Sequence, residues 1–204
     1  MTAADSRAPA PAWPAWPQFD AATERALVGA LRAGRWSVSA PSAGSPSLER
    51  RFATAFAAYN ASPYAVSVDH GSSALVVALE ALGVGPGDEV LVPAMTWVAS
   101  ASSVLRCGAL PVLLDVDPRS GCIDAATVAA EASARTAAVI VVHLACTSAG
   151  VEELLAVTDR LGIALVEDCA QCHGARWNGR SLGTFGAVGA FSFQARKVLT
   201  AGEG

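Results

Sequence analysis

Two cysteines and a histidine stand close together in the stretch EDCAQCHGA. The segment CAQCH matches the C-x-x-C-H pattern that attaches c-type haem, and C-x-x-C pairs also occur in redox centres and zinc sites. A third interpretation is that Cys169 and Cys172 are packing residues. The other three cysteines, Cys107, Cys122 and Cys146, are scattered and provide no second pair for zinc. The pattern leaves a haem or redox module open without favouring it.

A second set of residues points to pyridoxal phosphate chemistry. That cofactor needs an amine for its aldehyde, an acid partner for its pyridine nitrogen and an anion site for its phosphate. Gly71-Ser72-Ser73 stands between a predicted strand and a predicted helix, where free N–H groups and the positive helix end favour an anion. Asp168 ends an apolar strand, and Lys197 follows 29 residues later (197 − 168). Each has an ordinary explanation alone, as a cap or a surface charge, but together they supply what the cofactor requires.

The elements that must position these residues alternate along the chain. Apolar strands separated by helices predict an α/β fold with a mostly parallel sheet covered on both faces. Ligands bind such a sheet at the carboxyl ends of its strands. The predicted strands are 64–68, the end of 85–93, 110–116, 137–144, 163–169 and a short one after 187, and the predicted helices are 72–82, 97–107 and two beginning at Asp124 and Gly150. The residues just past the strand ends, expected in one crevice, are His70 to Ser73, Pro93 to Trp97, His143, and Asp168 to His173.

The N-terminal segment has a different composition. Residues 1–19 are rich in alanine and proline and predict an arm laid on the body or on a partner. Asp20 is the predicted N-cap of a helix ending near Gly34, and a second helix is predicted from Ser45 to Asn60. The arm has neither the basic nor the apolar region of an export signal, so we expect a cytoplasmic protein with reduced thiols.

The bulk composition excludes several classes of function. The chain has 204 residues, a net charge of −4 and 52% hydrophobic residues. An acidic chain has no basic surface for nucleic acid or an anionic membrane. The most apolar strip, TAAVIVVHLAC, is much shorter than the roughly 20 residues that span a bilayer. Because the chain is this apolar, we expect another subunit to cover part of its surface.

Three long segments carry a resemblance to a known family. GSSALVVALEALGVGPGDEVLVP, TWVASASSVLRCGALPVLLDVDP and VEDCAQCHGARWNGRSLGTFGAVGAFSFQARKVLTAGEG resemble the DegT/DnrJ/EryC1/StrS pyridoxal phosphate aminotransferases in motif order and spacing. The resemblance covers the chain from about residue 20 and implies the large domain of a fold type I enzyme, preceded by the arm. TWVASASSVLR and EDCAQ are most similar to the scyllo-inosose and 2-deoxy-scyllo-inosose aminotransferases, and WPAWPQFD is also similar to 3-amino-5-hydroxybenzoate synthases.

The resemblance implies roles for particular residues. Lys197 would bond to the cofactor aldehyde and then move a proton, and Asp168 would keep the pyridine nitrogen protonated. His173 matches a histidine of this loop for which a structural role and a catalytic role stay open. The remaining cofactor contacts would be Gly71, Ser72 and Ser192 at the phosphate, Trp97 stacked on the ring and Gln171 beside the ring oxygen.

The implied activity is transfer of an amino group from glutamine or glutamate to a ketocyclitol or keto-sugar, by a homodimer in the full-length form. The chain stops at Gly204, where the family usually continues, so the sequence predicts a partial large domain (20–204) without the C-terminal small domain. Asp69-His70 and Arg196 depart from residues common in the family. The alternatives are a hydroxybenzoate-synthase-like enzyme, a non-catalytic fragment and, least favoured, a haem or redox module.

Overall fold

The computed structural model describes residues 14–36, 44–148 and 150–203. The chain divides into two units after residue 41. The first unit contains helix α1 (Ala21–Ala33), and Asp20 caps it by accepting a hydrogen bond from the Thr23 N–H at 2.8 Å. The predicted helix is confirmed, whereas most of the predicted arm lies outside the described residues.

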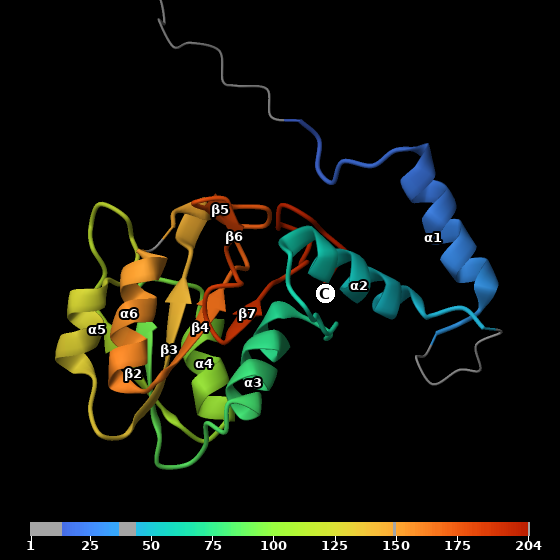
Figure 1. Ribbon diagram of the computed structural model, residues 1–204. Helices are drawn as coiled ribbons and strands as arrows, with labels where there is room; N and C mark the ends of the chain where they lie inside the picture. The colour runs from blue at the N-terminus through green and yellow to red at the C-terminus, as the bar shows by residue number, and fades with distance from the viewer. Residues whose placement is uncertain (1–13, 37–43, 149, 204) are drawn as a thin grey trace, which may run out of the picture. The chain divides into compact units, whose positions relative to one another are not determined.

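The second unit alternates helices and strands (Figure 1). Its helices are α2 (Leu48–Asn60), α3 (Gly71–Ala81), α4 (Ala99–Arg106), α5 (Ala125–Glu131), the short 3₁₀ helix η1 (Leu144–Cys146) and α6 (Val151–Leu161). Its strands are β1 (Glu89–Pro93), β2 (Leu110–Leu114), β3 (Thr136–Val142), β4 (Ala164–Asp168), β5 (Arg176–Trp177), β6 (Arg180–Ser181) and β7 (Val188–Ala190). No described helix is long and apolar enough to cross a membrane.

One parallel sheet organises this unit. Its strand order is β2-β1-β3-β4-β7, and every neighbouring pair is parallel. The strands β5 and β6 form a separate antiparallel pair. The α/β fold class predicted from the apolar strands is therefore confirmed.

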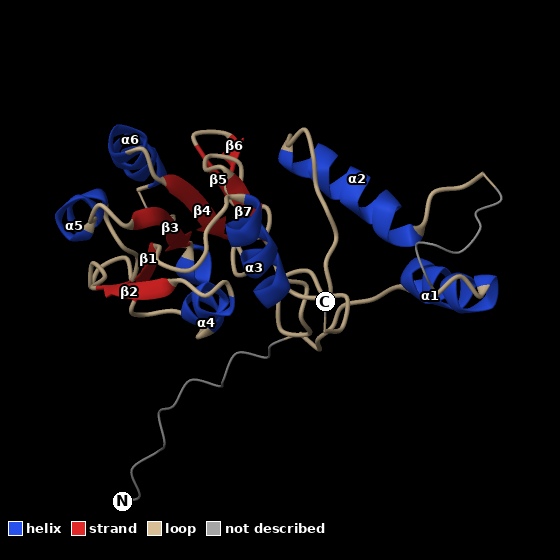
Figure 2. Cartoon of the chain, turned by 90° about the horizontal axis from the view of Figure 1, so that it is seen from below, coloured by secondary structure: helices blue, strands red, loops and turns tan. Residues whose placement is uncertain are grey.

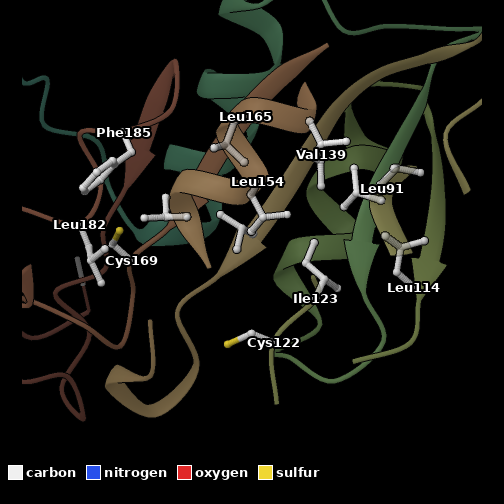
Figure 3. Packing of buried hydrophobic residues seen from close by; sticks show 14 of the residues in the cluster. Leu91, Leu114, Cys122, Ile123, Val139, Leu154, Leu165, Cys169, Leu182 and Phe185 are labelled. Atoms are coloured by element: carbon white, nitrogen blue, oxygen red, sulfur yellow. The ribbon is translucent and has the colours of Figure 1, made fainter. Parts of the chain in front are cut away.

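Each face of the sheet has its own core, because successive strand residues point to opposite faces. Figure 2 shows the sheet between α5 and α6 on one side and α3 and α4 on the other. Leu91, Val139 and Leu165 pack toward α5 and α6 (Figure 3), whereas Val166 and Ile140 pack toward α3 and α4. Both faces of the sheet are thus buried, which explains why its strands read as continuous apolar runs.

One predicted strand is wrong. Residues 64–68 form no strand and pair with none among the described residues, and Tyr64 and Val66 are 85% and 83% exposed. Their β-branched and aromatic side chains favour an extended backbone, but a strand also needs a partner for its N–H and C=O groups. The local sequence pattern does not supply that partner.

Candidate active site

The candidate site lies at the carboxyl ends of the central strands. Val142 of β3 is in register with Asp168 of β4, which is in register with Ala190 of β7. The chain leaves these three ends through His143, through the CAQCH turn and through Ser192. Because the strands are parallel, their ends meet at one edge of the sheet, as the sequence predicts.

Asp168 is a buried carboxylate with two hydrogen-bond donors. It is 6% exposed; Oδ2 accepts from the Ser100 hydroxyl at 3.2 Å, and Oδ1 accepts from the Ala170 N–H at 3.1 Å. Burial raises the pKa of Asp168, and the two hydrogen bonds and the charge of Lys197 only partly oppose this. The ionised carboxylate is therefore underpaired and would gain from a further cationic donor.

Lys197 follows β7 and faces the same region. Its backbone N–H donates to the Gln194 carbonyl at 2.8 Å, and its side chain is half-buried. Its positive charge lies near enough to lower the pKa of Asp168. Lys197 is also the single lysine in the sequence. The single lysine of the sequence thus lies close enough to the buried strand-end carboxylate for its charge to act on it.

The start of α3 and Ser192 meet across the site. A Cβ atom built on Gly71 would lie 2.6 Å from Ser192 Cβ, so only glycine allows this approach. The first N–H groups of a helix have no partner within it. His70 caps the Ser73 N–H through Nδ1 at 3.2 Å and the Ala74 N–H through its carbonyl, which leaves the N–H groups of Gly71 and Ser72 for an anion. The buried Ser192 hydroxyl lies beside them.

Asp69 adds a negative charge beside this cradle. Its carboxylate is 3.1 Å from His70 Nε2, and hydrogen bonding to the Ser73 hydroxyl is the main cause that lowers its pKa. Asp69 is largely exposed, so water screens its charge. Asp69 and His70, which differ from the residues common in the family, therefore form the N-terminal cap of α3.

Trp97 and Gln171 lie in surroundings that differ from those of Asp168 and Lys197. Trp97, in the loop between β1 and α4, is 69% exposed, so its ring is free to stack on a ligand and is no core residue. The Gln171 side chain accepts a hydrogen bond from the Ala145 N–H at 2.9 Å. That bond holds Gln171 against the turn formed by Ala145 and Cys146, whose φ angles are +50° and +64°.

Two buried polar residues next to the site were not singled out from the sequence. Ser100, fully buried in α4, binds the Asp168 carboxylate. Glu167, fully buried in β4, accepts hydrogen bonds from several backbone N–H groups and from His143. A glutamate within an apolar strand is the one signal that could have identified Glu167, because a buried charge requires partners.

Residues 21–204 match the model of the DegT/DnrJ/EryC1/StrS aminotransferase family. The chain belongs to that family. This is the family that the three quoted segments resemble, and its members are pyridoxal phosphate-dependent aminotransferases.

Individual family members resemble the chain over nearly its whole length. The L-glutamine:2-deoxy-scyllo-inosose aminotransferase of Streptoalloteichus tenebrarius is 51% identical over 94% of the chain and 45% of the relative. The crystal structure of 3-amino-5-hydroxybenzoic acid synthase superposes with a TM-score of 0.88 at 39% identity, over 95% of this chain and 49% of that one. A Streptococcus pneumoniae protein described as a sugar aminotransferase, solved in its PMP form, has a TM-score of 0.82 at 28% identity, over 90% and 48%. The chain spans about half the length of these family members.

The C-x-x-C-H segment of this family member is part of its core. Cys169 is 0% exposed and Cys172 is 1% exposed, and both belong to the cluster that packs against α6. The His173 ring contacts the rings of Phe191 and Phe193, and burial lowers its pKa. Thiols enclosed in this way cannot reach the edge of a haem. The packing interpretation therefore accounts for the two cysteines.

We expect the thiols to differ sharply in their reactivity. Burial raises the pKa of Cys169 and of Cys122, so neither forms a thiolate at neutral pH, whereas Cys146 is exposed. Iodoacetamide should modify Cys146 in the folded protein and leave Cys122, Cys169 and Cys172 unmodified until urea is added. Peptide mass spectrometry measures this directly. Rapid labelling of Cys172 under native conditions would contradict the packing interpretation.

The contact between Gly71 and Ser192 gives a second expectation. Gly71→Ala should separate α3 from Ser192 at a cost of about 1–3 kcal/mol, as overpacked sites do, and weaken pyridoxal phosphate binding by roughly tenfold. Urea denaturation and cofactor titration measure the two effects. Gly85→Ala is the matched control, because nothing lies within 4 Å of a Cβ atom at Gly85. Equal cofactor affinity in both variants would show that Gly71 does not contribute to phosphate binding.

Proposed function

We propose that this protein is a pyridoxal phosphate-dependent aminotransferase that moves an amino group from L-glutamine or L-glutamate to a ketocyclitol. The observation that carries the proposal is a buried strand-end carboxylate, Asp168, whose pKa is lowered by the charge of the only lysine in the sequence, Lys197, although burial raises it overall. The substrate class follows from the 51% identity to a glutamine:2-deoxy-scyllo-inosose aminotransferase. A keto-sugar is the related acceptor class.

The residues of the site fit pyridoxal phosphate. Asp168 is buried and lacks a full set of donors, which suits a protonated pyridine nitrogen. Gly71 and Ser72 offer backbone N–H groups at a helix start, which suits a phosphate. A Cβ atom at Gly71 would fill the space between α3 and Ser192. The bound cofactor would supply an aldehyde that captures amines and a ring that accepts electron density.

With the cofactor bound, each of these residues would have a separate role. Lys197 would hold the aldehyde carbon covalently and, once an amino donor replaces it, carry a proton between the donor's α-carbon and the cofactor carbon. Asp168 would keep the pyridine nitrogen protonated. Gly71, Ser72 and Ser192 would bind the phosphate. Two further contacts complete the set: Trp97 on the ring face and Gln171 at the ring oxygen.

The proposal includes a domain organisation and a partner. Residues 20–204 would form part of the cofactor-binding large domain, and residues 1–19 an arm. The full-length form would be a homodimer, consistent with exposed apolar side chains such as Leu105, Leu110 and Leu113.

A second candidate function is supported by the superposition on 3-amino-5-hydroxybenzoic acid synthase. An enzyme of that kind would keep the same lysine and the same carboxylate, but it would dehydrate and aromatise a six-membered carbocyclic acid. The two functions differ in their products. A ketocyclitol aminotransferase gives a saturated aminocyclitol, whereas the second gives an aromatic amine that absorbs in the near ultraviolet.

The test is to trap the cofactor and then to assay transfer. Purified protein is mixed with pyridoxal phosphate, reduced with borohydride, digested and mapped by mass spectrometry, and Lys197 should carry the phosphopyridoxyl group. The protein is next incubated with L-glutamine and 2-deoxy-scyllo-inosose or scyllo-inosose, and the aminocyclitol is detected by mass. Unmodified Lys197 in folded protein would refute cofactor binding by this chain. An adduct on Lys197 with conversion of another keto acceptor, but of neither of these two ketones, would refute the acceptor class.

A further inference from the structure

The carboxylate of Glu167 is saturated with hydrogen bonds. Oε1 accepts from the N–H groups of Phe185 and Gly186 at 2.7 and 2.8 Å. Oε2 accepts from the Gly183 N–H at 2.8 Å and from His143 Nε2 at 3.1 Å. A carboxylate has roughly four acceptor positions, so all of them are used. His143 must carry its proton on Nε2 to donate this bond.

The charge of Glu167 is stable in its buried position. Burial by itself raises the pKa of Glu167, but the hydrogen bonds from His143, Gly186 and Gly183 together hold that pKa below its usual value. Breaking one of these bonds would leave a buried donor or a buried charge without a partner, which is strongly destabilising. The Glu167 carboxylate therefore holds the His143 side chain and the backbone of residues 183–186 in place.

The donors come from the turn that feeds β7. Residues 183–186 end one residue before that strand begins, and the turn packs closely against β4: a Cβ atom on Gly186 would lie 2.4 Å from the Leu165 carbonyl oxygen. A Cβ atom on Gly189 of β7 would lie 2.2 Å from the Gly183 carbonyl oxygen. From this turn the chain runs through β7 to Ser192 and then to Lys197. The position of this turn therefore determines the position of β7 and of the segment beyond it that carries Lys197.

Glu167 does not face the ligand side itself. Leu165 packs in the core beside α5 and α6, and Val166 packs in the opposite core, so Glu167 and Asp168 point to opposite faces of β4. A metal ion does not explain the cluster either. Ligand atoms of His143, Glu167 and Cys169 lie within 4.8 Å of one another, but a cation would have to break the bonds that saturate the carboxylate.

We infer that Glu167 is a positioning residue for the cofactor site. It ties the ends of β3 and β4 to the turn before β7, and it thereby fixes the distance between Asp168 on β4 and Lys197 beyond β7. The inference rests on the proposed function for its chemical consequence, whereas the structural tie can be measured without cofactor. Glu167 acts through the backbone and touches neither substrate nor cofactor.

The test compares Glu167→Gln with a matched control, Glu89→Gln. Glu89 is also a buried carboxylate, 6% exposed and hydrogen-bonded to Arg135. It lies at the start of β1, at the amino ends of the strands, away from the candidate site. In the cofactor-free protein, the amides of Gly183, Phe185 and Gly186 should exchange hydrogen roughly tenfold faster in Glu167→Gln. They should exchange at the wild-type rate in Glu89→Gln. Unchanged exchange in Glu167→Gln would overturn the inference.

Two further readouts separate positioning from general destabilisation. At a fixed subsaturating concentration of pyridoxal phosphate, borohydride trapping on Lys197 should fall roughly tenfold in Glu167→Gln and remain unchanged in Glu89→Gln. The pH at which the absorbance of the cofactor bound at Lys197 changes should differ from the wild type in Glu167→Gln but not in Glu89→Gln, because it depends on how far the Lys197 nitrogen lies from the Asp168 carboxylate. Equal trapping and an equal pH midpoint in the two variants would overturn the inference.

Other outcomes are also decisive. If wild-type protein forms no adduct, the proposed function fails, and the exchange measurement still tests the structural tie. If Glu167→Gln does not fold, Glu167→Asp takes its place, because it keeps the charge but cannot reach all four donors. An aspartate variant with wild-type exchange and trapping would show that the position of the carboxylate is unimportant.

Discussion

Lys197→Ala is expected to abolish covalent capture of pyridoxal phosphate. The chain contains no other lysine, so borohydride trapping should leave no phosphopyridoxyl group on any side chain. The first step of amino transfer with L-glutamine should be lost as well, by roughly a factor of a thousand or more, because the residue that moves the proton is gone. Absorbance of the protein–cofactor mixture and peptide mass spectrometry measure the two losses.

The neighbouring residue provides the control for this variant. Arg196 is exposed and carries the same charge as Lys197, but it has no reactive amine. Arg196→Ala should therefore keep the adduct on Lys197. Trapping that persists on another site in Lys197→Ala, such as the N-terminal amine, would show that the adduct reports surface reactivity and not a built site.

Asp168→Asn is expected to stabilise the cofactor-free protein and to disable its chemistry. Burial raises the pKa of Asp168, so the ionised carboxylate opposes folding at neutral pH. Asparagine has nearly the same shape and carries no charge. Its amide oxygen can accept from the Ala170 N–H, and its NH2 group can donate to the Ser100 hydroxyl oxygen, which turns its own proton elsewhere. The free energy of unfolding should increase by about 1 kcal/mol, a gain typical of substitutions that remove a destabilising group from a functional site. Amino transfer should fall by roughly a hundredfold or more, because the ring nitrogen loses its ionic partner.

The pH dependence of stability follows from the same pKa. A carboxyl group with a raised pKa in the folded state holds its proton longer there than in the unfolded chain. The contribution of Asp168 to stability is therefore largest below its ordinary pKa of about 3.9 and is lost as the pH rises through the raised value. Asp168→Asn should remove this decline. Urea denaturation of the cofactor-free protein at several pH values measures it.

Cofactor should reverse the order of stabilities of the two proteins. A protonated pyridine nitrogen neutralises Asp168, so pyridoxal phosphate should raise the melting temperature of the wild type more than that of Asp168→Asn. Ser100→Ala is a useful companion, since it removes a donor to Asp168 and leaves the charge in place. If Asp168→Asn is less stable than the wild type without cofactor, the carboxylate has a structural role that outweighs its burial.

The sequence by itself determined the α/β fold and the edge of the sheet where the chemistry lies. Apolar strands between helices specify a sheet buried on both faces, and parallel strands bring their ends together. Asp168 was noted because a carboxylate at the end of an apolar strand needs partners, and Lys197 because, together with Asp168 and the Gly-Ser-Ser helix start, it completes the set of groups that pyridoxal phosphate requires. The family resemblance added the roles of Trp97, Gln171 and Ser192, which stay predictions.

Only the tertiary structure decided which groups are partners. Residues 64–68 have a strand-like sequence, yet they pair with no described strand, because pairing depends on what lies alongside. The approach of Gly71 to Ser192 and the attachment of the turn before β7 to Glu167 join residues far apart in the chain. Local pattern records burial and periodicity, whereas a hydrogen bond or a close approach depends on how separate elements are placed in space. The position of Lys197 relative to Asp168 is of this second kind.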